Sequence, residues 1–472
     1  MLKLIRIKLS LILALILCTS SSISILGQET ETSPWSRFGM GLTMPTLSSP
    51  QLLMGGVSSP MLDGFVINPD QPASAAGSVT TLFQSSIHGT NSNMTEGDST
   101  DTVNSGSIGA ISLVVKKPGG KTAFMMGLTP YSTKGYSVSR SYNDSLNNNI
   151  GNIRETYSGS GGTAKSYLGV ARAFKGKKWM SAGNIDSVLV SNRALFLGAQ
   201  VSFLFGEVIS TGRLDFEDVT YLDNKTSTSM RHRSLGGLFG VQAYQLLWAK
   251  YDENRNFKGS ATIFAGATYA PESLLFTDYE KSVETVQLLS SVETVIDTSS
   301  YINVLDAEGR IPSKLSAGGA IVFAQSDGSR FLISGDYMQE DWESISDSFD
   351  INILDGEATW AKASRTSLGV SITPNPDGAS FKAGYALDKY PIAYKGSQLE
   401  GWRASAGITV PLEGSRSTSR LHFGLEMGHR GLSINNGTVL EDNLEESLLK
   451  IQIGVTLAPF YKNLWLTPKL YD

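Results

Sequence analysis

The sequence predicts an all-β protein, a transmembrane antiparallel β-barrel of about 14 strands with an N-terminal hatch, or plug, inside its lumen. Three observations lead to this prediction. Segments of alternating apolar and polar residues recur along most of the chain, short and long connections alternate between them, and aromatic residues gather where the segments end. Bilayer-spanning strands alternate because one face meets lipid and the other meets the lumen, and aromatic side chains prefer the two interfaces.

Residues 448–460 show the alternation most clearly. One face carries Leu449, Ile451, Ile453, Val455 and Leu457, and the other carries Lys450, Gln452, Gly454, Thr456 and Ala458. Phe460, Tyr461 and Trp465 follow where such a strand would leave the bilayer. We therefore expect arginine to be costly at Ile453 or Leu425 and tolerated at Gln452 or Glu426, which would face the lumen.

Residues 1–27 have the pattern of a cleaved signal peptide. Three basic residues, Lys3, Arg6 and Lys8, precede an apolar core at residues 9–17, which is too short to span a bilayer. Cys18 could mark a lipid attachment site, but Leu17 occupies the position where such sites need a small residue. We expect export, and for a barrel this means the outer membrane of a Gram-negative cell.

Composition excludes several classes of function. The only cysteine lies in the predicted signal peptide, so the mature chain has neither disulfides nor thiolate metal sites. Removing three of the 39 basic residues leaves 36 against 44 acidic residues, a net charge of −8, which argues against nucleic acid as a partner. No later stretch is long and apolar enough for a transmembrane helix, and 48 glycines in 472 residues suit either a barrel or a large soluble β-protein.

Residues 28–77 are expected to form an N-terminal extension and the hatch. This segment shows no sustained alternation and is interrupted by Pro45, Pro50, Pro60, Pro69 and Pro72 and by several glycines. Its large apolar residues, among them Trp35 and Phe38, need burial, so the segment is neither a strand nor disordered.

The barrel is expected over residues 78–460, followed by a periplasmic tail at 461–472. The alternating segments lie at 78–90, 105–116, 121–140, 161–174, 194–208, 232–249, 259–270, 312–325, 330–340, 362–373, 379–388, 401–410, 420–429 and 447–460.

The connections between these segments favour a membrane barrel over a soluble sandwich. Short turns are expected at 118–120, 326–329, 374–378 and 411–419, and longer polar loops at 91–104, 141–160, 209–231, 271–311, 341–361, 389–400 and 430–446. Short periplasmic turns and long extracellular loops are typical of outer-membrane barrels. Residues 175–193 are the exception, because they are long for a periplasmic turn.

The tryptophans also fall at two levels. Trp342, Trp360 and Trp402 lie at the long-loop ends of the expected strands, and Trp179, Trp248 and Trp465 lie at the short-turn ends. Two aromatic levels are what two membrane interfaces require.

Several short motifs, taken in order, resemble the FadL-type outer-membrane transporters of long-chain fatty acids, in particular their Bacteroidota-type branch. The hatch motifs lie at 33–41, 54–57, 67–69 and 71–74, and further matches lie at 159–162, 167–169, 203–206, 311–315, 425–431, 463–465 and 469–472. The resemblance implies a fourteen-stranded barrel whose hatch includes Trp35, Arg37, Phe38, Gly55, Gly56, Asn68, Pro69 and Pro72. The family's Asn-Pro-Ala motif is split here into residues 68–70 and 71–73.

The same resemblance implies passive diffusion of hydrophobic, fatty-acid-like small molecules, with a lateral exit at a kink in the third strand. The expected partners are outer-membrane lipid, a hydrophobic small-molecule ligand and the outer-membrane insertion machinery. The alternative is a structural or adaptor barrel in an outer-membrane secretion or assembly complex. An open polar porin is disfavoured because the apolar hatch would fill the lumen.

The third expected strand contains candidate ligand or gate residues. Met125, Met126, Gly127, Pro130 and Tyr131 lie within it, and proline cannot donate a hydrogen bond to a neighbouring strand. Either the strand ends at Thr129, or Gly127 and Pro130 break the wall and the alternation resumes at Tyr136 and Val138. In the second case, Gly127→Val with Pro130→Thr should restore a continuous ladder and stop transport.

No motif indicates an enzyme or a cofactor. The chain has no hydrolase elbow, no phosphate-binding loop and no zinc-protease motif. His422 and His429 are separated by an odd number of residues and so face opposite sides of a strand, which argues against a shared metal ion there. His88 and His232 are distant in sequence, and Asp336 or Glu426 could assist a histidine only in principle.

Overall fold

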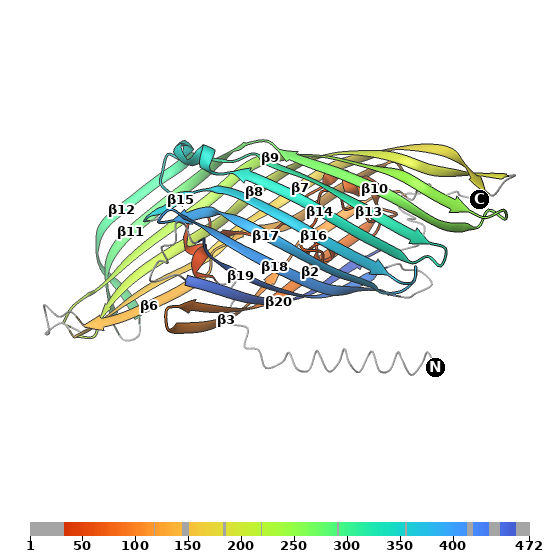
Figure 1. Ribbon diagram of the computed structural model, residues 1–472. Coiled ribbons are helices and arrows are strands. Elements are labelled where there is room, and N and C mark those ends of the chain that lie inside the picture. The colour runs from red at the N-terminus through yellow and green to blue at the C-terminus, as the bar shows by residue number, and fades with distance from the viewer. Residues whose placement is uncertain are drawn as a thin grey trace, which may run out of the picture.

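The wall of the molecule is a closed 14-strand antiparallel β-barrel, and the N-terminal segment lies inside it (Figure 1). The structure is a computed structural model that describes residues 33–117, 119–143, 151–182, 186–218, 220–289, 292–354, 356–412, 419–433 and 444–458. The expected signal peptide and the tail at 461–472 lie outside these residues. In the described part of the chain, no helix is long and apolar enough to cross a membrane.

The hatch contains four short elements before the first wall strand begins at Leu82. They are η2 (Pro34–Arg37), β1 (Leu42–Thr43), α2 (Ser49–Leu52) and η3 (Pro72–Gly77). Three of them have proline near the start, where the missing N–H costs no hydrogen bond. Ser48 caps α2 in a capping box with Gln51.

Nineteen further strands are described, and they combine into the fourteen wall strands. They are β2 (Leu82–Glu96), β3 (Ser99–Ile108), β4 (Ile111–Val115), β5 (Thr122–Thr133), β6 (Tyr136–Asn143), β7 (Asn152–Ala182), β8 (Asp186–Phe216), β9 (Asp223–Tyr251), β10 (Phe257–Ala270), β11 (Ser273–Leu289), β12 (Val292–Ile311), β13 (Lys314–Gln325), β14 (Arg330–Asp341), β15 (Ala358–Trp360), β16 (Lys362–Thr373), β17 (Ser380–Tyr394), β18 (Ser397–Pro411), β19 (Arg420–Leu432) and β20 (Leu444–Leu457). Five wall strands are each interrupted once and so appear as the pairs β3–β4, β5–β6, β10–β11, β12–β13 and β15–β16.

The last strand closes the barrel on the first, as the sequence predicted. β20 pairs antiparallel with β2 from Phe83↔Leu457 to Glu96↔Leu444. The expected faces are also confirmed, because Ile453 and Leu425 are 41% and 53% exposed on the outside, whereas Gln452 and Glu426 are 2% and 3% exposed on the inside. The outer surface is thus apolar and faces lipid.

Most of the expected long loops are instead β-ribbons. Residues 271–311 form the hairpin β11–β12, and the paired strands β7 and β8 run through the expected turn at 175–193. Both faces of a ribbon beyond the bilayer meet water, so its residues need not alternate in polarity. Because alternation was the signal used to recognise strands, these segments were interpreted as loops. The prediction of irregular loops was wrong there, although the fourteen-strand count was correct.

The tryptophans are only partly an interfacial girdle. Trp179, Trp248 and Trp402 are exposed on the outside at 64%, 42% and 37%. Trp342 is fully buried and stacks on Trp360, with ring centroids 4.8 Å apart, beneath η4 (Glu343–Ser348). The expectation that Trp342 lies at the membrane interface was therefore wrong, because a lid over the long-loop end of the barrel buries it.

Candidate functional site

The candidate functional site is the hatch together with the inner wall on which it lies. The hatch core has almost no exposed surface: Leu53, Met54 and Val57 are 0% exposed and Ile67 is 1% exposed. Its last element, η3, packs against β5, β7, β8 and β9. The apolar residues of the hatch thus find the burial that their composition requires.

Glycines of the inner wall form the seat of the hatch. A Cβ atom added to any of them would overlap hatch atoms, as at Gly198 with Ala73, Gly240 with Gln71, Gly266 with Ser59, Gly369 with Met54, Gly384 with Gly55, Gly424 with Leu53, and Gly454 with Ser49. Glycine in a strand often marks a place where another backbone approaches closely. The hatch backbone therefore rests directly on the wall.

Two hatch glycines complete this seat from the other side. Gly55 and Gly56 have φ values of 67° and 84°, a region that residues with side chains rarely adopt. Gly55 lies on Gly384 and its N–H donates to the Ser405 hydroxyl over 3.0 Å. The two residues were expected in the hatch from the motif resemblance, and the geometry gives the reason for glycine at both.

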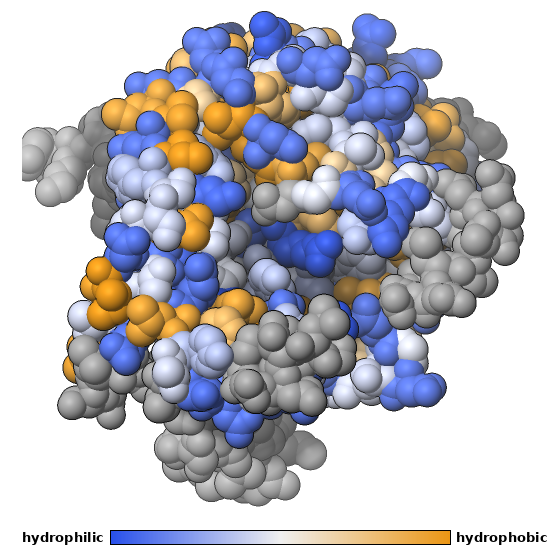
Figure 2. Space-filling view, turned by 90° about the vertical axis from the view of Figure 1, so that its left-hand side faces the viewer, coloured by the Kyte–Doolittle hydropathy of each residue, from blue (hydrophilic) through white to orange (hydrophobic). Residues whose placement is uncertain are grey.

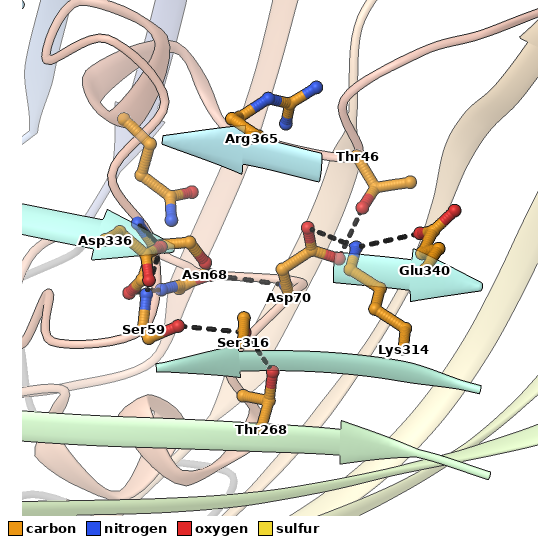
Figure 3. A network of polar contacts seen from close by, with 12 residues as sticks. Thr46, Ser59, Asn68, Asp70, Thr268, Lys314, Ser316, Asp336, Glu340 and Arg365 are labelled. Atoms are coloured by element: carbon orange, nitrogen blue, oxygen red, sulfur yellow. Dashed lines mark hydrogen bonds and ion pairs between the residues drawn. The ribbon is translucent and has the colours of Figure 1, made fainter. Parts of the chain in front are cut away.

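A polar network fastens the middle of the hatch to β13 and β14 (Figure 3). Asp336 accepts hydrogen bonds from the backbone N–H groups of Ser58 and Ser59, at 2.9 and 3.0 Å. The Ser59 hydroxyl donates to Ser316 over 2.9 Å. The amide group of Asn68 donates to the Ser58 carbonyl over 2.9 Å and so holds two hatch turns together.

Asp70 anchors the neighbouring part of the hatch. It accepts a hydrogen bond from Thr46 and forms an ion pair with Lys314, 3.3 Å away, and Lys314 also lies 3.9 Å from Glu340. Burial by itself raises the pKa of Asp70, but Lys314, Lys165 and the Thr46 hydroxyl outweigh burial and lower this pKa to about 2. Asp70 is therefore ionised at neutral pH.

A second group of buried charges lies nearer the long-loop end. Asp388 accepts from Arg365 at 2.6 Å and from Arg403 at 2.7 Å, and Arg403 also lies 3.4 Å from Glu426. Arg430 donates to Glu446 at 2.7 Å, and Glu446 also accepts from the hatch residue Ser33 at 2.7 Å. Removing one partner from a buried pair leaves an uncompensated charge, so these groups constrain both the wall and the hatch.

Free space remains in the lumen on both sides of the seated hatch. A cavity of about 110 Å³ lies between the hatch and the long-loop end, and its lining includes seven charged residues: Asp70, Lys165, Lys314, Glu340, Arg365, Asp388 and Lys389. Figure 2 looks onto this end, and hydrophilic side chains form the floor of the hollow near its centre. A cavity of about 430 Å³ lies on the other side of the hatch.

The wall is broken beside Pro130. The β4–β5 ladder ends at Ile111↔Leu128, two residues before Pro130. Beyond this point, and within the described residues, β3 pairs only with β2 and β6 pairs only with β7. The pairing between the second and third wall strands thus stops where the proline removes a donor.

The hatch continues the wall at this break. β1 pairs antiparallel with the end of β5, Leu42↔Thr133 and Thr43↔Ser132, and the Met44 N–H donates to the Tyr131 carbonyl over 2.8 Å. The Ser33 N–H donates to Gly135 over 2.7 Å. The hatch therefore acts as a wall strand here and satisfies backbone groups that would otherwise lack partners.

The candidate gate residues are dispersed around this break. Met125 is buried against the hatch, whereas Met126 is 42% exposed on the outer face, so the two do not form one surface. Gly127 pairs regularly with Ser112 and Tyr167, and the register shift lies instead between Pro130 and Ser132. Pro130 borders a cavity of about 50 Å³ beside the hatch, and Tyr131 lines the charged cavity.

Gly127 accommodates a side chain from the neighbouring strand. A Cβ there would come within 2.6 Å of the Tyr167 hydroxyl, which hydrogen-bonds to Ser112 over 2.7 Å across the glycine. Gly127→Val would therefore collide with Tyr167 and would not restore a ladder, because the ladder at this residue is already continuous.

The remaining hatch residues have structural contacts. Trp35 and Phe38 are 5% and 2% exposed, and the Arg37 guanidinium lies 4.5 Å from the centre of the Phe38 ring. Pro69 precedes Asp70, and Pro72 begins η3 against Gly240. Among the described residues, no three His, Cys, Asp or Glu side chains are placed to hold a metal ion.

The chain matches one protein-family model over most of its length and resembles several solved barrel structures. A protein-family model described as BamG matches residues 6–465. A Pseudomonas aeruginosa FadL homologue has a similar structure, with a TM-score of 0.50 and 10% identity, covering 89% of this chain and 100% of that one. No curated protein has a significantly matching sequence.

Two further solved structures are similar at lower scores. The Pseudomonas putida toluene transporter TodX has a TM-score of 0.49 and 14% identity, covering 92% of this chain and 100% of that one. The Ralstonia pickettii toluene transporter TbuX has a TM-score of 0.47 and 13% identity, covering 88% and 98%. At such identities the likeness is one of fold alone.

Proposed function

The chain belongs to the BamG family, and from this premise we propose that it is a structural or adaptor barrel of an outer-membrane assembly complex. The observation that supports this most strongly is the seat of the hatch. The hatch backbone lies on wall glycines, and buried ion pairs and hydrogen bonds hold both its ends and its middle. Such a barrel offers its partners a rigid, closed body.

The chemistry of the lumen also favours this function over a channel for apolar molecules. Ligand pockets usually measure about 300–1,000 Å³ and are mostly apolar. The cavity towards the long-loop end holds only about 110 Å³ and has seven charged residues in its lining, whereas the cavity on the other side of the hatch holds about 430 Å³. An apolar molecule there would remove water from charged groups without replacing their hydrogen bonds, which is unfavourable.

Affinity purification from native outer membranes tests the adaptor function. We expect the tagged protein to co-purify in fixed stoichiometry with other envelope proteins, including components of the outer-membrane insertion machinery. We also expect its depletion to lower the amounts of other outer-membrane barrels while their synthesis continues. Purification as a lone barrel, with unchanged amounts of other barrels on depletion, would contradict the proposal.

The second candidate is passive diffusion of hydrophobic, fatty-acid-like molecules with a lateral exit. The break beside Pro130 supports it, because only the short β1 strand and nearby hatch residues fill the wall there. Opening this side requires the hatch segment 33–45 to leave β5. Uptake of a fluorescent fatty acid into liposomes that contain the purified barrel, compared with liposomes that lack it, tests this function.

A further inference from the structure

The barrel wall carries an unusual group of basic residues at its short-turn end, which we expect to face the periplasm. The ribbon that β7 and β8 form at residues 173–193 projects from this end, opposite to β11 and β12 (Figure 1). At its base lies a cavity of about 670 Å³. Its charged lining residues are all cationic: Lys121, Arg172, Lys175 and Arg193.

Among the described residues, these four have no carboxylate partner. No ion pair involves them among the described residues, and the cavity lining contains neither aspartate nor glutamate. The whole chain carries a net charge of −5, so a basic cavity does not simply follow from its composition.

The floor of the basic cavity is apolar and belongs to the lipid-facing surface. Phe174, Leu195 and Ile263 line it and are 49%, 41% and 40% exposed. Small residues, Ala243 and Ala265, lie between them and deepen the surface. Towards the membrane centre the same face continues with exposed Val170 and Leu197.

The position of the cavity fits the boundary between hydrocarbon and headgroups. Arg193 pairs with Gln245 on β9, and exposed Trp248 lies three residues beyond Gln245. Tryptophan prefers this boundary, and long basic side chains near it extend their charges towards the headgroups. Arg193 also lies across Gly176, where a Cβ would approach its Cγ to 2.9 Å.

We propose that this cavity binds an anionic phospholipid of the periplasmic leaflet. Its phosphate lies between Arg172 and Arg193, and an acyl chain lies along Phe174, Leu195 and Ile263. A basic pocket that opens onto a lipid-facing wall is suited to an anionic headgroup. An acidic periplasmic protein would match the charges but would leave the apolar floor facing lipid. The inference does not depend on the proposed adaptor function.

Native mass spectrometry of the purified full-length mature barrel tests this site. Phosphatidylglycerol and phosphatidylcholine with identical acyl chains are added to separate samples, and the bound molecules are counted. We expect a retained phosphatidylglycerol and no retained phosphatidylcholine. Equal retention of both lipids would overturn the proposal, and this comparison needs no variant.

Paired variants locate the site. Arg172→Gln with Arg193→Gln should weaken phosphatidylglycerol retention by about fivefold for each charge removed. Lys177→Gln with Lys178→Gln is the matched control, because it removes the same charge from the same ribbon but outside the cavity lining. Equal loss in both pairs would indicate general electrostatic attraction and overturn the site.

Two further experiments distinguish the phospholipid from free phosphate and from an acidic protein as the molecule bound in the cavity. Millimolar inorganic phosphate should not displace phosphatidylglycerol from the wild-type barrel, because phosphate lacks the acyl chain. Displacement by phosphate alone would contradict a lipid site. Loss of a co-purified acidic protein in the Arg172/Arg193 variant, with phosphatidylglycerol retention unchanged, would equally contradict it and assign the surface to that protein.

Discussion

The two sides of the barrel hold the same hatch in different ways. On the β16–β20 side every strand pairs with its neighbour, with one register shift between β17 and β18, and the hatch backbone rests on glycines such as Gly384 and Gly369. On the side of β3 and β5 the ladder is interrupted, and the hatch strand β1 supplies the missing partner. The hatch is therefore a plug on one side and a piece of wall on the other.

This difference indicates where movement is possible. If the hatch left the β16–β20 side, apolar hatch residues such as Leu53 and Met54 would be exposed to water, and a cavity would remain where they had packed. Leaving the β5 side would break the two-residue β1 ladder and the hydrogen bonds that residues 33–44 form with residues 131–135. Any opening should therefore start at β1, while the rest of the hatch stays seated.

The largest expected effect concerns the buried pair that holds the hatch near the break. Arg430→Met leaves Glu446 buried without its cation and should lower the free energy of unfolding by about 3–5 kcal/mol. Arg233→Met is the control, because Arg233 pairs with Asp278 at an exposed site, and it should cost about 1 kcal/mol or less. Urea unfolding of refolded barrels measures both, and equal losses would show that the pair does not constrain the barrel.

The next effect concerns the glycine seat. Gly384→Ala places a Cβ against Gly55 and should cost about 2–3 kcal/mol, with increased protease cleavage of the displaced hatch. Gly319→Ala should cost little, since the nearest atom to its Cβ is the Phe264 carbonyl oxygen at 3.7 Å. If the two variants unfold alike and resist protease alike, the hatch does not rest on the wall as described.

Asp70 gives a pH-dependent effect. Its pKa of about 2 lies below the ordinary 3.8, so its stabilising contribution is present above pH 3.8 and disappears as pH falls towards 2. The difference corresponds to about 2 kcal/mol. Asp70→Asn should thus be less stable than wild type at pH 7 and equally stable near pH 2; a constant difference across this range would contradict the assignment.

The smallest expected effect concerns the break in the wall beside Pro130. Pro130→Thr returns an N–H at a position where the ladder with β4 has already ended, so stability should change by about 1 kcal/mol or less. Gly127→Val should be clearly more destabilising because of Tyr167. A stabilised Gly127→Val barrel would show that the local wall is not as regular as its pairing indicates.

The sequence predicted the barrel because one face of each strand must be apolar. Ile453 and Gln452 fall on their expected sides, and the strand count is correct. Segments beyond the bilayer lack this constraint, so β11 and β12 could not be recognised from alternation. The position of the break was indicated by Pro130, the residue in that strand that cannot donate a hydrogen bond.

The seat of the hatch could not be predicted in the same way. Lumen-facing positions were expected to tolerate arginine, yet Glu426 is buried and lies 3.4 Å from Arg403, and Gln452 lies against Gly424 beneath the hatch. Small and polar residues on the inner face fit a water-filled lumen as well as a tightly occupied one. The inner glycines were visible in the sequence, but only the path of the hatch shows which atoms they admit.

A disulfide between the hatch and the wall tests the central claim most directly. Thr43 and Ser132 are opposite each other in a pair without mutual backbone hydrogen bonds, the closer kind of antiparallel pair, and Thr43→Cys with Ser132→Cys should cross-link there. The account predicts that cells with the oxidised variant maintain outer-membrane barrels as well as cells in which it is reduced, because the hatch stays closed during function. Loss of these barrels, or of fatty-acid uptake into liposomes, on oxidation and its recovery on reduction would contradict a permanently seated hatch.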